Sequence, residues 1–228
     1  MSPLFTHEAQ RRDRNDQIAL VKRIVGSGRR PYGRKSMLND RSSILSLLET
    51  RRSAKPRELV GPGPTAAELD RMLTIAARTP DHGKLHPWRF VTVAEDQRDA
   101  LADLLLEALG EENAGATDAH RQKEREFAHY AGQLMVLVSA PFRDHKIPLW
   151  EQELSCGAAG MNLLMAAHAL GYVAGWVTGW RAYSERVRSA FCAPGERIGG
   201  FIFIGHAARE VEDRPRPTLS DIVRQWQP

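Results

Sequence analysis

The stretch Pro80-Asp81-His82-Gly83-Lys84-Leu85-His86-Pro87-Trp88 decides the fold of this chain. Its two prolines and its glycine are incompatible with a helix, so we predict a rigid loop. The loop follows a helical pattern and runs directly into the apolar segment Phe90-Val91-Thr92-Val93. Loops at such junctions hold polar groups at the mouth of a sheet, where binding sites are often built. We therefore expect this loop to carry part of a functional site.

Two helices are predicted upstream of the loop. The first is capped by Ser42 or Ser43 and ends at Arg51-Arg52, with an apolar face formed by Ile44, Leu47 and Leu48. Residues 53–64 are rich in proline and glycine and are predicted to be a linker. A capping box at residues 65–68 starts the second helix, whose apolar stripe comprises Leu69, Met72, Leu73, Ala76 and Ala77.

Helices and short strands are mixed after the loop, and the helices dominate. Residues 150–170 are apolar over most of their length and predict a long, buried central helix that Gly171 ends. A leucine-rich helix is predicted at 96–109. A polar loop at 111–118 follows, and after it a charged helix that ends at about residue 131. Two short helices are predicted at 184–191 and over 219–226. Strands are predicted at 90–93, 134–139 and 201–204, with a strand or turn at 174–179. The pattern indicates an α+β protein with helices around a central sheet.

The charge of the chain is concentrated at its start. Residues 1–40 contain nine Lys/Arg and four Asp/Glu, whereas residues 41–228 contain 23 and 24. We therefore predict a basic, flexible extension over residues 1–40 and one folded domain over 41–228. An alternative is that the natural chain starts at Met37. The balanced charge of the body gives no indication that it binds nucleic acid.

The two cysteines, Cys156 and Cys192, are far apart in segments that resemble buried helices, which is typical of a reduced protein. No apolar run reaches transmembrane length, and the N-terminus lacks the apolar centre of a signal peptide. We expect a cytoplasmic protein that does not bind membranes.

Several common catalytic signatures are missing from the sequence. It contains no dinucleotide-binding glycine fingerprint, no P-loop and no nucleophile elbow. His82 and His86 have the spacing of a helical metal pair, but Gly83 and Pro87 argue against a helix, so no metal site is expected. Arg51-Arg52-Ser53 remains as a candidate phosphate-binding group, because guanidinium and hydroxyl groups are good phosphate donors. Cations that merely favour a helix C-terminus explain the two arginines equally well.

Four segments in order resemble one family. They are Arg51-Arg52-Ser53, the loop at 80–90, Lys146-Ile147-Pro148-Leu149-Trp150-Glu151-Gln152-Glu153, and Gly175-Trp176-Val177-Thr178-Gly179. Together they resemble the FMN-dependent nitroreductases, most of all the YdjA-type branch, from about residue 41 to the C-terminus. The resemblance implies a nitroreductase-like fold with a mostly antiparallel central sheet, in an intertwined homodimer that holds FMN at the subunit interface.

The resemblance also implies roles for individual residues. Arg51, Arg52 and Ser53 would bind the phosphate and ribityl chain of FMN. His82 and His86 would approach the flavin from the partner subunit, and Trp176, Val177 and Thr178 would line its other side. The helix end from Ala166 to Gly171 would touch the nicotinamide nucleotide. The implied activity passes a hydride from NADH or NADPH, through the flavin, to a small nitroaromatic, quinone or enone acceptor.

Two positions depart from the family pattern. Residue 86 is His where the branch usually has glutamine, and residue 177 is Val where arginine is common. A non-catalytic flavin-binding or flavin-storing protein is therefore one alternative function, and a nucleic-acid-associated protein acting through residues 11–35 is another. Without the resemblance, Trp88 and Trp176 are interpreted as core aromatics and His82 as a cap of a turn.

Overall fold

The computed structural model describes residues 37–228. The predicted extension at 1–40 therefore lies almost wholly outside the described residues, and it stays a prediction. Residues 38–212 form one compact unit, whereas residues 213–228 belong to a second unit and contain the short helix α8 (Leu219–Ile222). Among residues 37–228, no helix has the length and apolar character needed to cross a membrane.

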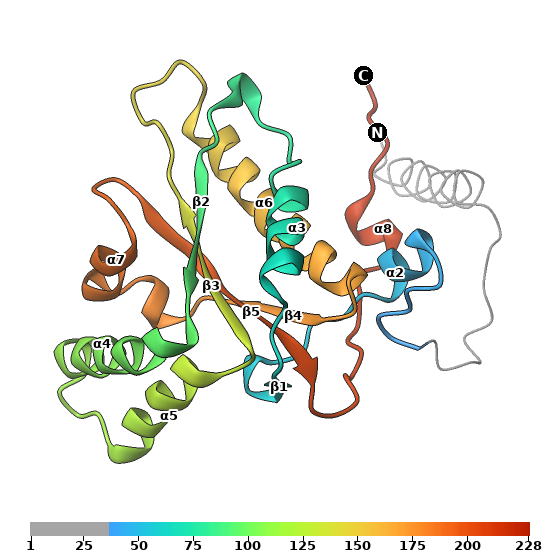
Figure 1. Ribbon diagram of the computed structural model, residues 1–228. Helices are drawn as coiled ribbons and strands as arrows, with labels where there is room; N and C mark the ends of the chain where they lie inside the picture. Colours follow the sequence, from blue (N-terminus) through green and yellow to red (C-terminus); the bar gives the residue numbers. More distant parts are fainter. Residues whose placement is uncertain (1–36) are drawn as a thin grey trace, which may run out of the picture. The chain divides into compact units, whose positions relative to one another are not determined.

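A five-stranded sheet organises the larger unit (Figure 1). Its strands are β1 (Leu59–Val60), β2 (Trp88–Val93), β3 (Gln133–Ser139), β4 (Val173–Val177) and β5 (Arg197–Ala207). β5 pairs with β3 on one side and with β1 and β4 on the other, and β2 forms the edge beyond β3. Each of these pairings is antiparallel, which confirms the predicted sheet type.

Alternating side chains of β3 and β5 separate the two layers of helices. Leu134, Val136 and Phe203 face α4 (Arg98–Glu112), α5 (Asp118–His129) and α7 (Glu185–Phe191). Met135 and Ile202 face α3 (Ala66–Ala76) and α6 (Leu149–Ala169). Because successive residues of a strand point to opposite faces, two apolar strands can supply both cores. Figure 1 shows the two groups of helices on opposite sides of the sheet.

An aromatic cluster binds α5 to the sheet. The ring of Phe127 meets the rings of Phe201 and Phe203 edge-on, with centroid separations of 5.4 and 5.0 Å. The Arg181 guanidinium lies 3.8 Å from the Phe127 ring centroid and donates two hydrogen bonds to the buried carboxylate of Glu124. Pairing both charges with hydrogen bonds offsets the cost of burying them.

The central helix α6 lies very close to the sheet at Gly160. A side chain at this position would come within 2.8 Å of Trp176 and Leu137. Glycine is therefore the residue that permits the close packing of α6 over β3 and β4. The opposite side of α6 carries the exposed apolar side chains of Trp150, Leu154 and Met161. The prediction of a long central helix is confirmed, but its burial within this one chain is confined to one side.

Several local predictions need correction. The linker at 53–64 contains a 3-10 turn (η1, Pro56–Glu58) and strand β1, which pairs with β5. The last strand is longer than predicted, and α8 spans four residues and ends well before Trp226. Cys192 is the half-buried residue that follows α7, whereas Cys156 is buried in α6, as predicted. Both cysteines are free thiols.

Truncation of the aromatic cluster tests this description of the core. Phe201→Ala should lower the free energy of unfolding by about 3–5 kcal/mol, because Phe201 is completely buried and its loss leaves a cavity. Phe142→Ala is the matched control, since Phe142 is 54% exposed, and its effect should stay within about 0.5 kcal/mol. Urea titration followed by circular dichroism measures both. Equal losses would contradict the assignment of Phe201 to the core.

Candidate active site

The arginine segment follows α2 (Ile44–Thr50) and is held by local hydrogen bonds. Arg51 Nη1 donates to Ser53 Oγ at 3.1 Å, which aligns two of the predicted phosphate-binding groups. Arg52 is used differently: its Nη1 and Nε donate to the carbonyl oxygens of Ser53 and Glu212 at 2.8 and 2.9 Å. The two adjacent arginines thus have different partners, and Arg52 is largely committed to the backbone.

This segment lies against β4 and the end of α6. A side chain at Gly175 would come within 2.7 Å of the carbonyl oxygen of Ala54, so the chain after Ser53 runs directly over β4. The fold therefore places Arg51-Arg52-Ser53 beside the strand that ends in Trp176 and Val177. Gly171 closes α6 in a left-handed conformation with φ of +99°, as predicted for a terminating glycine. Ala166, in contrast, is 2% exposed and packs into the core, so it does not face a ligand.

A buried histidine next to this segment was not predicted from the sequence. His168 is in the last turn of α6, is 1% exposed, and has no hydrogen-bond partner at either ring nitrogen. Burial, and to a smaller extent the nearby charge of Arg51, lowers the pKa of His168 to about 4. An unpaired buried imidazole costs about 1–3 kcal/mol, so groups of this kind are often retained for a ligand. The available signal was a histidine within the apolar run Met165-Ala166-Ala167-His168-Ala169-Leu170.

The loop at 80–88 is fastened to the other end of α6. Ser155 Oγ donates to the carbonyl oxygen of Pro80 at 2.8 Å, and Trp88 Nε1 donates to Ser155 Oγ at 3.2 Å. His86 N donates to the carboxylate of Asp81 at 2.7 Å, which closes the loop on itself. The prediction of a rigid loop is therefore consistent with its hydrogen bonds.

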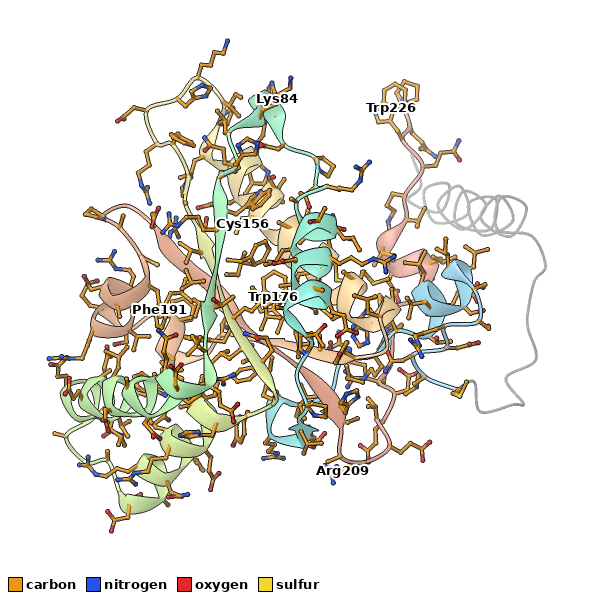
Figure 2. All side chains as sticks on the ribbon, viewed as in Figure 1. Lys84, Cys156, Trp176, Phe191, Arg209 and Trp226 are labelled. Carbon is orange, nitrogen blue, oxygen red and sulfur yellow. The ribbon has the colours of Figure 1, made fainter. Side chains whose placement is uncertain are left out.

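Backbone strain is concentrated in the same loop. Gly83, Lys84 and His86 have φ of 77°, 57° and 49°. Positive φ is unfavourable for residues with a side chain, and such strain is found mainly at functional sites. The loop also displays exposed polar side chains. Lys84 points outward at the tip in Figure 2, and His82, the residue before the positive-φ stretch, forms a 2.7 Å hydrogen bond from Nδ1 to Glu151 Oε2.

The two tryptophans take part in packing. Trp176 Nε1 donates to the carbonyl oxygen of Gly199 at 3.0 Å, and its ring packs with α6 near the centre of the unit (Figure 2). Trp88 packs with Phe90 against the same core. The core interpretation of both residues is thus supported. Val177 packs against the opposite core, and Thr178, just beyond β4, is exposed.

The histidine loop and the arginine segment lie near opposite ends of α6, whereas Trp176 packs near its middle, beside Gly160. Glu151, the partner of His82, is in the first turn of α6, and His168, the neighbour of Arg51, is in the last turn. At 1.5 Å per residue these positions are about 25 Å apart. The hollow beside Arg52 and Ser53 has a volume of about 40 Å³, which is far too small for a flavin. One chain therefore does not bring the two groups together around one mononucleotide.

Metal chemistry finds no support in the described part of the chain. Residues 37–228 contain no group of three or more His, Cys, Asp or Glu side chains arranged to hold a metal ion.

The chain combines an antiparallel sheet, a long helix on one face of that sheet, and a strained polar loop near one end of the helix. Comparison with known proteins identifies the class of protein that has this fold. The model of the Nitroreductase family matches residues 48–206. A protein of Escherichia coli strain K12 named "Putative NAD(P)H nitroreductase YdjA" is 36% identical over 162 residues, which cover 71% of this chain and 86% of that protein. The chain belongs to the Nitroreductase family, and the predicted enzyme class, an oxidoreductase of the nitroreductase type, is confirmed.

Solved structures agree with this fold. A nitroreductase-like family protein from Bacillus cereus superimposes with a TM-score of 0.66 at 20% identity, covering 81% of this chain and 96% of that one. A variant of the FMN and NADPH-dependent nitroreductase NfnB from a Sphigopyxis strain superimposes with a TM-score of 0.63 at 20% identity, covering 81% and 99%. The predicted nitroreductase-like α+β fold is therefore confirmed.

The buried histidine makes stability depend on pH. Because the pKa of His168 falls from 6.5 in a free imidazole to about 4 in the folded state, the unfolded chain binds the extra proton first. The free energy of unfolding should therefore fall as the pH falls from about 6.5 to about 4, by about 3 kcal/mol more in the parent than in His168→Leu. Denaturant titrations at several pH values measure this difference. Parallel pH profiles would contradict the placement of His168.

Proposed function

We propose that this protein is an FMN-dependent oxidoreductase that passes a hydride from NADH or NADPH to a small nitroaromatic, quinone or enone acceptor. It works as an intertwined homodimer with FMN at the subunit interface. The observation that carries the proposal is the separation of the two site groups along α6, since a second chain is required to bring a loop from one subunit to the arginine segment of the other. The predicted cytoplasmic location remains part of this proposal.

The residues present fit FMN at the arginine segment. Arg51 and Ser53 are joined by a hydrogen bond and together offer guanidinium and hydroxyl donors to a phosphate. The imidazole of His168 lies next to Arg51 and has no protein partner, but at 1% exposure it lies behind the segment and does not itself reach a ligand. The Arg52 guanidinium holds the segment in place through two carbonyl oxygens. Arg51 and Ser53 would bind the phosphate end, and FMN, when bound, supplies the hydride chemistry.

In the proposed dimer, the loop at 80–88 is the part of the site that the other subunit would contribute. His82 and His86 are exposed on a backbone held by hydrogen bonds, so their positions are set before a ligand arrives. Thr178 is exposed at the end of β4 and would line the flavin with the backbone of Val177. Residue 177 is a valine whose side chain packs into the core, so this position provides no positive charge. Acceptors with a negative charge should therefore gain no electrostatic attraction from it.

The exposed apolar face of α6 fits a surface that a partner covers. Trp150, Leu154 and Met161 are 67, 53 and 38% exposed, and α2 adds the exposed apolar side chains of Ile44, Leu45 and Leu48. Large apolar side chains that are exposed on a helix face fit a surface that is covered in a homodimer. A second copy of the chain is the occupant that the composite site requires.

Cofactor binding can be tested with an absorption spectrum. The purified protein should show oxidised flavin bands near about 370 and 450 nm that bleach with anaerobic NADH or NADPH. Arg51→Gln should weaken FMN binding by about 10–100-fold, because it removes a charge-assisted hydrogen bond to phosphate. Arg57→Gln, at an exposed arginine of η1, is the matched control and should bind FMN normally.

Each alternative function predicts a different result in this experiment. A flavin that binds but does not bleach would favour a storage protein. A chain that stays colourless after incubation with FMN would contradict the proposal. The nucleic-acid alternative concerns residues 11–35, which lie outside the described residues, and it predicts salt-sensitive binding that disappears when residues 1–36 are removed.

The dimer has its own test. Met161→Glu places a charge on the exposed apolar face of α6, so it should shift the protein from dimer to monomer and release FMN at the same time. Ala100→Glu, at an exposed position of α4 on the other side of the sheet, should leave both unchanged. Sedimentation velocity with detection at the flavin band follows mass and cofactor together. A flavin-loaded monomer would contradict the composite site.

A further inference from the structure

A histidine–carboxylate pair stands at the tip of the strained loop. His82 Nδ1 lies 2.7 Å from Glu151 Oε2, although the two residues are 69 positions apart in the sequence. A carboxylate accepts hydrogen bonds, so Nδ1 carries the hydrogen and Nε2 is left for another partner. An imidazole oriented by a carboxylate in this way is a common arrangement for moving a proton.

Both members of the pair are held by rigid elements. Glu151 is in the first turn of α6, where a negative charge is favoured by the helix dipole. His82 begins the 3-10 turn η2 (His82–Lys84), and a side chain at the following residue, Gly83, would come within 2.3 Å of Ile147 Cδ1. The turn therefore lies tightly against the segment before α6. The ring of His82 itself remains accessible, with 67% of its side chain exposed.

The other titratable groups near the end of this loop do not form such a histidine–carboxylate pair. The Asp81 carboxylate already accepts from His86 N, and His145 Nδ1 accepts from Ile147 N at 3.1 Å. Lys84 and His86 are exposed on the same loop. Among the histidines of the described tip, His82 is the one joined to a carboxylate. It therefore has both a fixed orientation and an open nitrogen.

We propose that His82, oriented by Glu151, donates the proton that the acceptor needs when it takes up a hydride. The inference rests on the proposed flavin oxidoreductase function, which supplies the hydride. A quinone that receives a hydride becomes a hydroquinone anion, which carries the two electrons and the first hydrogen. Solvent first protonates Nε2 of the imidazole, whose Nδ1 hydrogen is held by Glu151. This proton then moves to the anionic oxygen, the Nε2–H bond breaks as the O–H bond forms, and the imidazole left behind is neutral, with its hydrogen on Nδ1, until solvent protonates it again.

The two residues have separate roles in this step. His82 would touch the acceptor and is the catalytic residue, whereas Glu151 is a positioning residue that acts through the imidazole. Removing a general acid typically slows a reaction by about 10²–10⁴-fold. Removing its orienting carboxylate should have a smaller effect, because the imidazole is retained but its orientation is no longer fixed.

The experiment compares two oxidants of the reduced, flavin-loaded protein in stopped flow. A quinone requires a proton, whereas ferricyanide takes one electron and no proton. His82→Ala should lower the ratio of the quinone rate to the ferricyanide rate by about 100-fold or more, and added imidazole should restore part of it. Glu151→Gln should lower the same ratio less. His129→Ala is the matched control, since His129 also pairs with a carboxylate, that of Asp99, and its ratio should equal that of the parent.

A second readout does not depend on turnover. Nitrogen-15 NMR distinguishes the two neutral tautomers of an imidazole, so His82 should carry its hydrogen on Nδ1 in the parent and lose this preference in Glu151→Gln. An unchanged tautomer would overturn the role of Glu151. Equal slowing of both oxidants in His82→Ala, or a full quinone rate, would overturn the role of His82. Failure of the proposed function looks different, because the parent protein would then not bind FMN or would not bleach with NADH or NADPH.

Discussion

The packing of α6 against one face of the sheet is the constraint on which the rest of the structure depends. Gly160 allows the helix to approach β3 and β4 closely, and the buried apolar residues of β3 and β5 hold it there. Because α6 is straight and long, its two ends hold the two halves of the candidate site apart. In the proposed homodimer, the length of this one helix is the reason that the site is shared between subunits.

The two arginines after α2 illustrate how neighbouring residues of one type take different tasks. The sequence offers Arg51 and Arg52 as equivalent cations. In the structure, α2 ends at Thr50, so neither arginine lies in its last turn. Arg52 donates to two carbonyl oxygens and stiffens the segment, whereas Arg51 aligns with the hydroxyl of Ser53 and affects the pKa of His168. A phosphate would therefore meet one well-positioned guanidinium on a segment made rigid by the other.

Features with a local cause could be predicted from the sequence, whereas features that depend on distant partners could not. The capping box of Thr65 and Glu68 and the end of α6 at Gly171 both follow from residues close in the chain. Strand β1 was missed because two residues form a strand only by pairing with β5, about 150 positions away. The pairing of His82 with Glu151 and the burial of His168 near Arg51 could not be predicted for the same reason, since α6 brings together residues that no sequence pattern links.

The separation of the two groups along α6 has a genetic consequence under the proposed arrangement. Each site would take its arginine segment from one chain and its loop from the other. A chain defective only at Arg51 and a chain defective only at His82 would then form a mixed dimer in which one site contains both defects and the other contains neither. Two inactive alleles expressed together would complement each other, and the recovered activity would be proportional to the number of mixed dimers.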